Sequence, residues 1–399
     1  MSGRPVFETV GSPHPDRAAR VGALKALGFG WADLEEEPYW IDQAVAVRAD
    51  VYDELERAAA ALWAVFDKAA RYVIGRRDLY PLLGIPEVLW DLLDTAEPGP
   101  PGLLSRYARF DFAISESGDI RLLELNADTP TGYVEAAVAT PWTCEQHGLG
   151  HRNGGMAGLV AEAWAAERPE AAACVAYGSH AEDSGTIEML VRHSGRSMRC
   201  LDCLELSIED GVLLDGGLNP VRRAFLLYPK EWMAVDEGGE ALAYAASSGQ
   251  LALFNPPHAV LLQSKGLQAL IWGLYELGLE FGEREREAIG AYMLPTYNKA
   301  VFDGSFVSKS MFGREGGSVR LYGTDGKLEV KDEIGFDTSR FFPRVFQKRA
   351  ELAQIRLHNG AFHLLTGLFV LNGTPRGLLG RAGGPITGNA SHFIAMGVQ

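Results

Sequence analysis

Two short runs in the segment 109–132, RFDFAISESGDIRLLELNADTPTG, alternate polar and apolar residues around the turn sequence SESGD. This pattern predicts a β-hairpin, because a period of two is typical of strands and Ser, Gly and Asp are typical of turns. Residues two apart in a strand point to the same face. Arg109 and Asp111 therefore share one face of the first strand, and Glu124 and Asn126 share one face of the second. Polar residues are depleted in strands, so their presence here indicates a functional site.

The two polar faces meet if the predicted strands, over residues 109–114 and 121–126, pair in the matching register. Two carboxylates, an amide oxygen and a guanidinium then converge. Oxygen ligands of this type suit magnesium, which keeps several waters and is usually completed by substrate phosphates. Arg109 would help to hold a negative group beside the metal, and the alternative is a salt-bridge network around this arginine. The opposite face of the hairpin is expected to pack in the core through Phe110, Phe112, Leu123 and Leu125.

A glycine-rich turn follows another strand-like run in the sequence KSMFGREGGSV. Glycines at these positions would let backbone N–H groups face phosphate oxygens without obstruction by Cβ atoms; they are Gly313, Gly316 and Gly317. Lys309 and Arg314 would add positive charge, the lysine as a compact point and the arginine as a fork for two oxygens. The alternative is a plain hairpin with a charged tip, because SFVSKSMFGREGGSVRLYG is the clearest hairpin in the last hundred residues. The turn lacks the Gly-Lys-Ser/Thr ending of a Walker loop.

Two further basic residues stand at boundaries between predicted elements and are candidates for the same phosphates. Lys265, in VLLQSKGLQ, lies where an apolar strand is predicted to stop and a helix to begin. The alternative for Lys265 is an exposed lysine at a helix entry. Arg381, in GLLGRAGGPITGNASHF, lies between a strand-like run and another glycine-rich segment.

The rest of the pattern is typical of one integrated α/β unit. Apolar residues at helical spacing predict a long amphipathic helix over 51–74, and a Thr/Pro signal predicts a second helix in TPTGYVEAAVATPWTCEQHG. Residues 151–250 are mixed, with strands in ACVAYG and RAFLLYP and a helix starting in EDSGTIEMLVRHSG, and residues 301–399 are strand-rich. A chain of 399 residues exceeds what one core usually supports, so two or three subdomains around a shared cleft are expected.

The composition argues against several partners. A net charge of −15, from 37 basic and 52 acidic residues, disfavours nucleic acid and anionic membranes, and fits a cationic substrate or plain solubility. The start MSGRPVFETV lacks the apolar core of a signal peptide, and no uncharged apolar run approaches about 18 residues, so a cytoplasmic location is expected. The four cysteines do not form a disulfide framework. Cys200 and Cys203 form a single C-x-x-C without a nearby His, which favours structural thiols over a metal or redox site.

Taken together, these segments resemble the glutathionylspermidine synthase-like ligases, the stand-alone synthetase branch of the ATP-grasp superfamily. RFDF…LLELNADTPT is similar to that family's metal-binding segment, and SKSMFGREGG is similar to its mobile phosphate-covering loop. Further matches are GFGWADLEEEPYW, LLYPKEWM, LLQSKGLQALIWGL and GLLGRAGGPITGNASHF. They follow the family's order from about residue 15 to the carboxyl end, so the resemblance covers nearly the whole chain.

The resemblance implies an α/β (α+β) ATP-grasp fold, ATP between interleaved lobes, two magnesium ions, and a carboxylate activated as an acyl phosphate for attack by an amine. By position, the implied metal ligands are Asp111, Glu124 and Asn126. The implied catalytic arginines are Arg109, near the transferred phosphoryl group and the acyl oxygen, Arg314 on the covering loop, and Arg381. The implied nucleotide contacts are Lys265, Lys309, Gly313, Gly316, Gly317 and, at the start of an adenine hinge, Gln347. The implied substrate contacts are Thr129, Thr131, Glu182 and Asp183.

Four regions are expected on this basis. They are a helical pre-ATP-grasp region (1–100), the metal-binding hairpin with its following helix (101–150), a substrate-side α/β lobe (151–255) and a nucleotide-binding lobe with the mobile loop and the last core strands (256–399). The bifunctional members of the family carry an amino-terminal cysteine amidase, for which this chain has no room, so amidase activity is not expected.

The expected function is that of an ATP-dependent carboxylate–amine ligase. The acid would be a small molecule, for which a peptide such as glutathione is a candidate, and the amine a polyamine such as spermidine. One alternative is a catalytically silent nucleotide-binding sensor or scaffold. Another is a peptide-type ligase that uses an amino acid as the amine acceptor.

Overall fold

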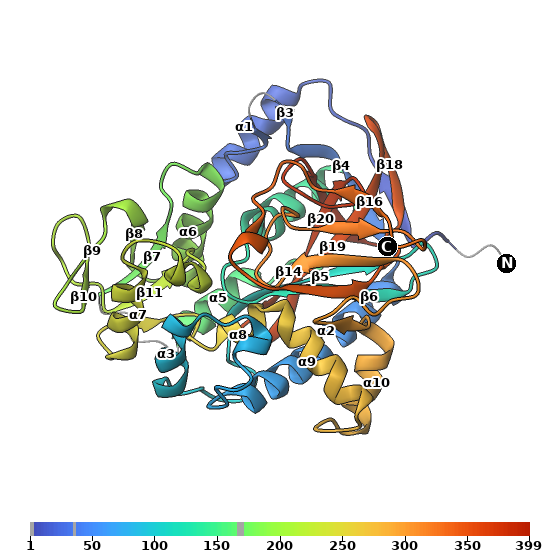
Figure 1. Cartoon of the computed structure of the whole chain (residues 1–399). Helices are drawn as coiled ribbons and strands as arrows, with labels where there is room; N and C mark the ends of the chain where they lie inside the picture. Colours follow the sequence, from blue (N-terminus) through green and yellow to red (C-terminus); the bar gives the residue numbers. More distant parts are fainter. Residues whose placement is uncertain (1–3, 35–36, 166–170) are drawn as a thin grey trace.

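The largest sheet of the molecule has eight strands, in a computed structural model that describes residues 4–34, 37–165 and 171–399. The strand order is β1-β4-β21-β20-β19-β5-β6, with β18 also paired to β19 (Figure 1). Neighbours are antiparallel except β4 and β21, which are parallel. The strands are β1 (Phe7–Val10), β4 (Trp40–Val47), β5 (Tyr107–Ile114), β6 (Ile120–Asn126), β18 (Gln354–Leu357), β19 (Gly360–Leu371), β20 (Thr374–Gly383) and β21 (His392–Val398). One sheet therefore joins both ends of the chain to the predicted hairpin.

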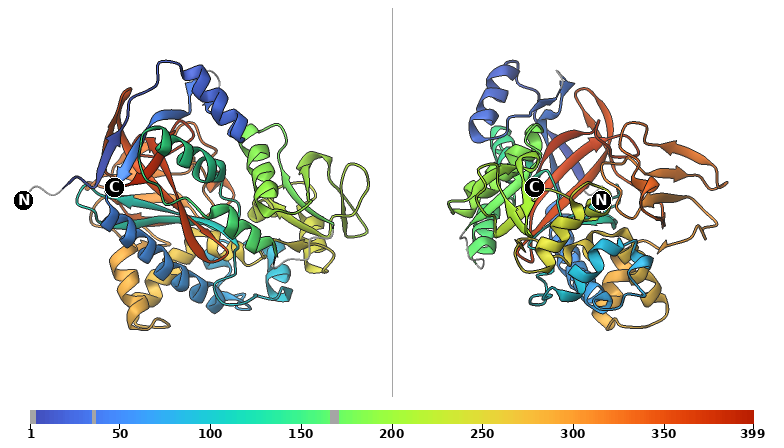
Figure 2. Two further views of the ribbon diagram at one scale, coloured as in Figure 1. Left: turned by 180° about the vertical axis from the view of Figure 1, so that it is seen from behind. Right: turned by 60° about the vertical axis from the view of Figure 1, so that its left-hand side comes forward.

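Two smaller sheets lie on different sides of the large one (Figure 2). A parallel sheet has the order β12-β11-β7-β8, and an antiparallel sheet has the order β13-β17-β14-β15-β16. The strands predicted in ACVAYG and RAFLLYP are confirmed as β7 and β11. The bounds are β7 (Ala172–Ala176), β8 (Arg199–Asp202), β11 (Arg223–Leu226), β12 (Ala252–Leu253), β13 (Thr296–Tyr297), β14 (Phe306–Ser310), β15 (Arg320–Tyr322), β16 (Leu328–Lys331) and β17 (Arg344–Lys348). Two short ribbons pair β2 (Asp33–Leu34) with β3 (Glu37–Pro38) and β9 (Ser207–Glu209) with β10 (Val212–Leu214).

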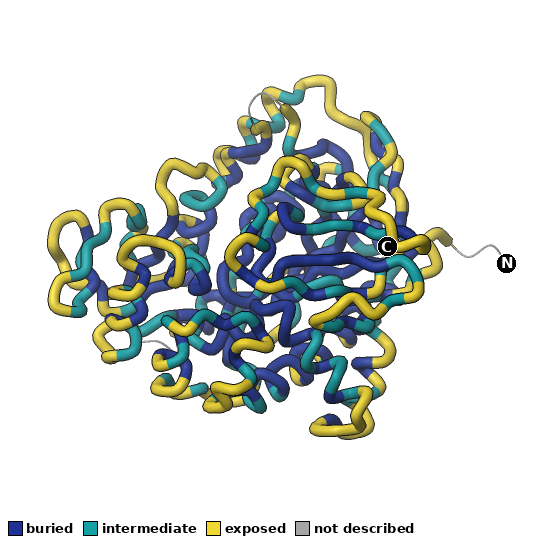
Figure 3. The backbone as a smooth tube through the Cα atoms, viewed as in Figure 1, coloured by how far each residue is buried: buried dark blue, intermediate teal, exposed yellow. Residues whose placement is uncertain are grey.

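Helix α2 (Ala49–Val73) confirms the amphipathic helix predicted over residues 51–74. Its apolar side is buried, as Leu62 and Phe66 illustrate with no exposed surface. Phe66 packs edge-on against Phe110 of β5, with ring centres 5.7 Å apart. The buried side of the helix thus covers the apolar face of the hairpin, whose strand β5 is buried along its whole length (Figure 3).

The remaining helices confirm two predictions and correct a third. The helix predicted after TPTG is present as a π-helical turn (Glu135–Ala139) that continues into α4, and α6 confirms the helix predicted in EDSGTIEMLVRHSG. The strand predicted before Lys265 is wrong, because that apolar run is the short helix α8. Periodicity cannot distinguish a strand from a helix over five residues. The helices are α1 (Arg17–Leu27), α3 (Trp90–Thr95), α4 (Thr140–Gln146), α5 (Met156–Ala165), α6 (Ala181–Ser194), α7 (Gly239–Ser247), α8 (Ala259–Gln263), α9 (Lys265–Glu276) and α10 (Glu283–Tyr292). Within the described ranges, none of the helices is long and apolar enough to cross a lipid bilayer.

Candidate active site

The hairpin of β5 and β6 brings its four polar side chains together. Arg109 lies opposite Asn126, and Asp111 lies opposite Glu124. Arg109 donates to both carboxylate oxygens of Asp111, from Nε at 2.6 Å and from Nη2 at 2.8 Å. Asn126 Nδ2 donates to Asp111 Oδ2 at 3.0 Å and to Glu124 Oε1 at 3.4 Å. The predicted hairpin and the register of these four residues are confirmed. The cluster contains the salt bridge and the two convergent carboxylates, but the amide nitrogen of Asn126 faces these carboxylates, and its oxygen accepts from Gln263 Nε2 at 3.5 Å.

A β-bulge shifts the register just beyond this cluster. Asp111 pairs with Glu124, but the next residue, Phe112, pairs with Leu122, so Leu123 is the extra residue. The expectation that Leu123 packs on the core face is therefore wrong, and Leu122 takes that place with 1% of its surface exposed. The carbonyl oxygen of Leu123 instead accepts a hydrogen bond of 3.1 Å from Lys309 Nζ. The bulge thus turns a backbone acceptor toward the site.

The donor set of the hairpin fits a divalent cation. The described residues contain no group of three or more His, Cys, Asp or Glu side chains that could hold a metal ion by themselves. A cation at the hairpin would be held by Asp111, Glu124 and, after rotation of the side-chain amide, the oxygen of Asn126, with its other positions completed by phosphate oxygens and water. This is the coordination that magnesium prefers.

Two buried lysines face the hairpin from other elements. Lys265 starts α9 and is 2% exposed, so the alternative of an exposed lysine is wrong. Its Nζ lies 3.3 Å from Glu124 Oε2 and donates to the carbonyl oxygen of Gly313 at 2.8 Å. Lys309 lies on β14 and donates to Gln347 Oε1 at 2.9 Å. Gln347 Nε2 in turn donates a hydrogen bond of 3.0 Å to Gln268 Oε1.

These charges keep the hairpin carboxylate ionised. Burial alone would raise the pKa of Glu124, but the charges of Lys265 and Lys309 outweigh burial and lower this pKa to about 2. Burial also lowers the pKa of Lys309 to about 8, against the opposing attraction of Glu124. Glu124 is therefore anionic at every physiological pH.

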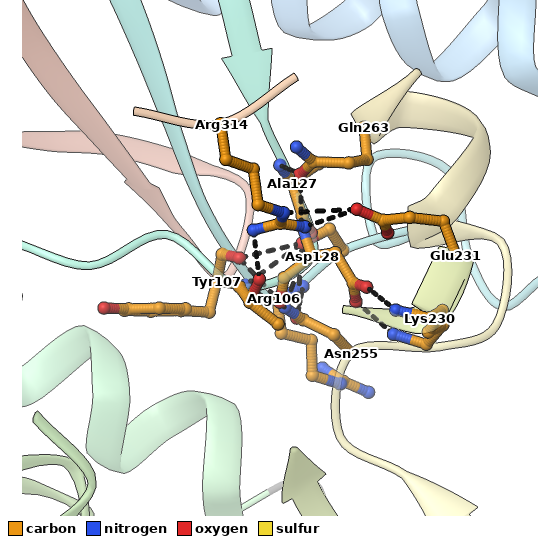
Figure 4. Close-up of polar contacts among 11 residues, drawn as sticks. Arg106, Tyr107, Ala127, Asp128, Lys230, Glu231, Asn255, Gln263 and Arg314 are labelled. Carbon is orange, nitrogen blue, oxygen red and sulfur yellow. Dashed lines mark hydrogen bonds and ion pairs between the residues drawn. The ribbon is translucent and has the colours of Figure 1, made fainter. Parts of the chain in front are cut away.

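The glycine-rich turn connects β14 and β15, which confirms the hairpin predicted there. Arg314 donates to Glu231 Oε1 from Nε at 3.1 Å and from Nη2 at 2.9 Å (Figure 4), and its Nη1 donates to Thr129 Oγ1 at 2.8 Å. Gly316 has a φ of +77°, which favours glycine, and a Cβ atom at Gly317 would overlap the backbone of Phe336. The loop therefore packs closely, with its arginine directed at the segment that follows β6.

Three other predicted residues, Thr131, Glu182 and Arg381, are linked to Arg109. Arg109 Nη1 donates to the carbonyl oxygen of Thr131 at 2.6 Å. The Thr131 side chain hydrogen-bonds Glu182, and the charges of Arg381 and Arg109 also act on this carboxylate. Arg381 lies on β20 and donates to the carbonyl oxygen of Gly388 at 2.9 Å. The structure thus connects Thr131, Glu182 and Arg381 to the hairpin through Arg109.

A buried acidic group adjoins these residues, and its carboxylates have raised pKa values. Glu135 has no exposed surface; its Oε1 accepts from Trp31 Nε1 at 2.8 Å and from Tyr39 Oη at 3.1 Å, whereas its Oε2 has no hydrogen-bond partner among the described residues. Burial, followed by the charge of Glu182, raises the pKa of Glu135 to about 7. Burial and the same neighbour raise the pKa of Asp183 to about 6, and burial also raises the pKa of Glu182.

Glu135 and Glu231 are two buried carboxylates for which the sequence patterns predicted no role. Glu231 lies in LLYPKEWM, a segment that the family resemblance includes without a function for this residue. Glu135 lies in YVEAAVA, where a single acidic residue interrupts an apolar helical run. An acidic residue in such a run was the available signal, because carboxylates are almost never fully buried without a partner.

Comparisons with known proteins agree with these observations. The family described as glutathionylspermidine synthase pre-ATP-grasp matches residues 12–399. A protein of Haemophilus influenzae whose name includes the words acid–amine ligase is 25% identical over 401 residues. The alignment covers 95% of this chain and 97% of that protein.

Proposed function

The chain belongs to the glutathionylspermidine synthase pre-ATP-grasp family and has the ATP-grasp fold, and from this premise we propose that it is an ATP-dependent carboxylate–amine ligase. In the proposed reaction, the γ-phosphoryl group of ATP passes to a carboxylate, and an amine attacks the resulting acyl phosphate to form an amide. ADP and phosphate are released. Phosphoryl transfer asks a protein chiefly for positioning and charge neutralisation, which agrees with a site made of lysines, arginines and oxygen ligands.

The nucleotide side of the proposed site is the cluster around Glu124. Lys265 and Lys309 would bind the phosphates, and Asp111, Glu124 and Asn126 would hold one or both of two magnesium ions. Bound magnesium would offset negative charge on the phosphates. Gln347 orients Lys309 through their hydrogen bond, and we keep its segment as the proposed start of the adenine hinge. Backbone N–H groups of the glycine-rich loop would complete the contacts to phosphate.

The acid and amine side of the proposed site lies beyond Arg109. Arg109 and Arg381 would hold the transferred phosphoryl group and the carboxylate substrate by charge. Thr129, Thr131, Glu182 and Asp183 would contact the substrates, and we add Glu135 to this set. A group of partly or fully buried carboxylates with raised pKa values is stabilised by a cation, and a protonated amine supplies one. A polyamine and a peptide acid such as glutathione are the proposed pair.

One observation carries this proposal above the others: β5 and β6 pair in the register that sets Asp111 against Glu124, with Lys265 3.3 Å from Glu124. The proposed oxygen ligands and the proposed phosphate-binding lysine thus come from segments about 140 residues apart in the sequence, and their closeness supports the proposal.

The test is a screen of acid and amine pairs for magnesium-dependent ADP release, with the product identified by mass. ADP release that needs both partners, with a product of the condensed mass, supports the ligase. Nucleotide binding without turnover across a broad panel would instead favour the sensor, and a product formed only with amino acids would favour the peptide-type ligase. Incubation with a glutathionyl amide, with the free acid and amine detected by mass, tests our proposal that the chain lacks amidase activity.

We also retain the four regions 1–100, 101–150, 151–255 and 256–399 as a proposed division. The parallel sheet of β12, β11, β7 and β8 is drawn from residues 172–253, and the sheet that carries Lys309 is drawn from residues 296–348. Both sheets fall within single proposed regions, which supports the division.

A further inference from the structure

Two neighbouring residues of the 3₁₀ helix Lys230–Ala234 form buried ion pairs with different parts of the molecule (Figure 4). Lys230 pairs with Asp128, and both side chains are at most 4% exposed. Glu231 pairs with Arg314 at 2.9 Å, and their side chains are 0% and 24% exposed. The first pair joins two fixed segments, whereas the second joins a fixed segment to the glycine-rich loop.

The segment that follows β6 is fixed by its backbone hydrogen bonds. Gln263 Oε1 accepts from the backbone N–H groups of Ala127 at 2.9 Å and Asp128 at 3.1 Å, and Asn255 Nδ2 donates to the carbonyl oxygen of Asp128 at 2.7 Å. The backbone N–H of Lys230 donates to Asp128 Oδ2 at 3.0 Å. These contacts hold the 3₁₀ helix, and therefore Glu231, in place relative to the end of β6 that carries Asn126.

The loop is held across this end of β6 at two points. At its start, the carbonyl oxygen of Gly313 accepts from Lys265 Nζ. One residue later, Arg314 spans the gap between Glu231 and Thr129 with three hydrogen bonds. Glu231 Oε2 has no hydrogen-bond partner within the described residues, so Arg314 supplies the side-chain compensation for the Glu231 carboxylate. Removing one member of a buried pair leaves an uncompensated charge, which is strongly unfavourable.

We propose that Glu231 is a positioning residue that holds Arg314, and with it the loop around residues 312–318, over the metal-binding end of the hairpin. The inference rests on the proposed function for what the held loop achieves, which is exclusion of water from the acyl phosphate. Glu231 touches neither nucleotide nor substrate in this proposal and acts through Arg314. Its carboxylate also opposes any movement of Arg314 away from the site, since that movement would leave Glu231 buried without a partner.

The experiment is limited proteolysis of the full chain by trypsin without ligands, followed by mass spectrometry. Trypsin cleaves after Arg314 when the loop opens, and cleavage after Lys327, whose side chain is 83% exposed, serves as the internal reference. Because cleavage follows the population of the open form, Glu231→Gln should raise the rate after Arg314 at least about fivefold relative to Lys327. The control is Glu237→Gln, an exposed carboxylate close to the same helix, which should match the wild type.

An unchanged rate after Arg314 in a folded Glu231→Gln variant overturns the proposal. Should this variant fail to fold, Arg314→Lys provides the same test, because it keeps the trypsin site but cannot contact Glu231 and Thr129 together. The rate of cleavage after residue 314 in this variant is divided by the rate at the same bond in a synthetic peptide of residues 308–320 with the same substitution. This corrects for the different rates at which trypsin cleaves after Lys and Arg. Corrected cleavage at position 314 as slow as in the wild type then overturns the proposal.

A second readout separates positioning from a purely structural role. In Glu231→Gln, the ratio of ADP released to amide formed should rise about threefold or more. An open loop admits water, which hydrolyses the acyl phosphate before the amine can attack it. A ratio equal to that of the wild type would contradict the role of Glu231 in holding the loop. The proteolysis needs no activity, so a wild type without ligase activity would overturn the proposed function and leave the ion pair testable.

Discussion

Two groups of carboxylates within the candidate site differ in what surrounds them. Glu124 lies beside Lys265 and Lys309, and its pKa is lowered to about 2. Glu135 is fully buried, whereas the Glu124 side chain is 24% exposed. The neighbours of Glu135 are Trp31, Tyr39 and another carboxylate, and its pKa is raised to about 7. Burial acts in the same direction on both groups. The difference therefore comes from the charges that each segment of the fold brings into range.

The elements that carry the two groups account for this difference. Glu124 lies on a strand, between β5 and the basic residues that α9 and β14 contribute. Glu182 and Asp183 lie in the first turn of α6, where the helix dipole favours negative charge by a few tenths to about 1 kcal/mol. Burial and mutual repulsion exceed this contribution, because their pKa values are raised. The negative charge of Glu124 is thus balanced by lysines of the protein itself. The negative charge near α6 is balanced by a cationic substrate in the proposed function.

Removal of Glu124, the carboxylate that lies beside two lysines, should have the largest effect on turnover. Glu124→Ala should lower kcat at least about 10³-fold, because it removes a magnesium ligand and the partner of Lys265. Turnover is measured as magnesium-dependent ADP release, and circular dichroism verifies the fold. Glu116→Ala, in the exposed turn of the same hairpin, is the matched control. Near-wild-type turnover in the Glu124 variant would refute the metal assignment.

Neutralising Glu135, in the group of carboxylates that no nearby lysine balances, should impair use of the amine substrate and leave ATP binding unchanged. Glu135→Gln retains an oxygen acceptor for Trp31 and Tyr39 but loses the charge, so kcat/KM for the amine should fall about 10- to 100-fold. KM for ATP should stay within about twofold. In the wild type, KM for the amine should decrease as pH rises through about 7, where Glu135 ionises, and this dependence should disappear in the variant. Equal effects on both substrates would argue for a structural role.

The same variant should change how stability depends on pH. The folded pKa of Glu135 is raised from 4.5 to about 7, so the folded state binds the proton more tightly than the unfolded chain does. Protonation of Glu135 therefore stabilises the fold below about pH 4.5, and this contribution is lost as pH rises to about 7. Relative to wild type, Glu135→Gln should gain on the order of 2 kcal/mol between pH 5 and pH 8.

Urea denaturation at the two pH values measures this change. The exposed Glu188→Gln on α6 is the control and should show the wild-type dependence. A Glu135 variant with the pH dependence of the wild type would show that the carboxylate is not perturbed by its surroundings.

The smallest effect is expected at Lys309. Lys309→Met should raise KM for ATP about tenfold, because one charged contact to phosphate is lost while Lys265 remains. KM for the amine should be unchanged. Lys327→Met, in the exposed turn between β15 and β16, is the control. An increase in KM for the amine alone would contradict the assignment of Lys309 to the nucleotide side of the site.

Local patterns predicted the parts of the site that lie on regular elements. The alternation around Asp111 and Glu124 predicted both strands and their shared polar face, and the glycines after Lys309 predicted the loop between β14 and β15. The prediction was wrong at Leu123, because a bulge changes the period of two and no residue type marks it. It was also wrong before Lys265, where four apolar residues and Gln263 form a short helix. Short segments take their structure from what they pack against.

The sequence by itself determined the hairpin and the glycine-rich loop, because each depends on residues close together in the chain, and it determined the family through the order of matching segments along nearly the whole chain. Only the tertiary structure decided the partners of the buried carboxylates: Arg314 is 83 residues from Glu231, and Trp31 is 104 residues from Glu135. Period and propensity describe neighbours along a strand or helix. The charge felt by a buried carboxylate depends on its distance in space to every cation and on the water removed around it, and these are set when the elements pack together.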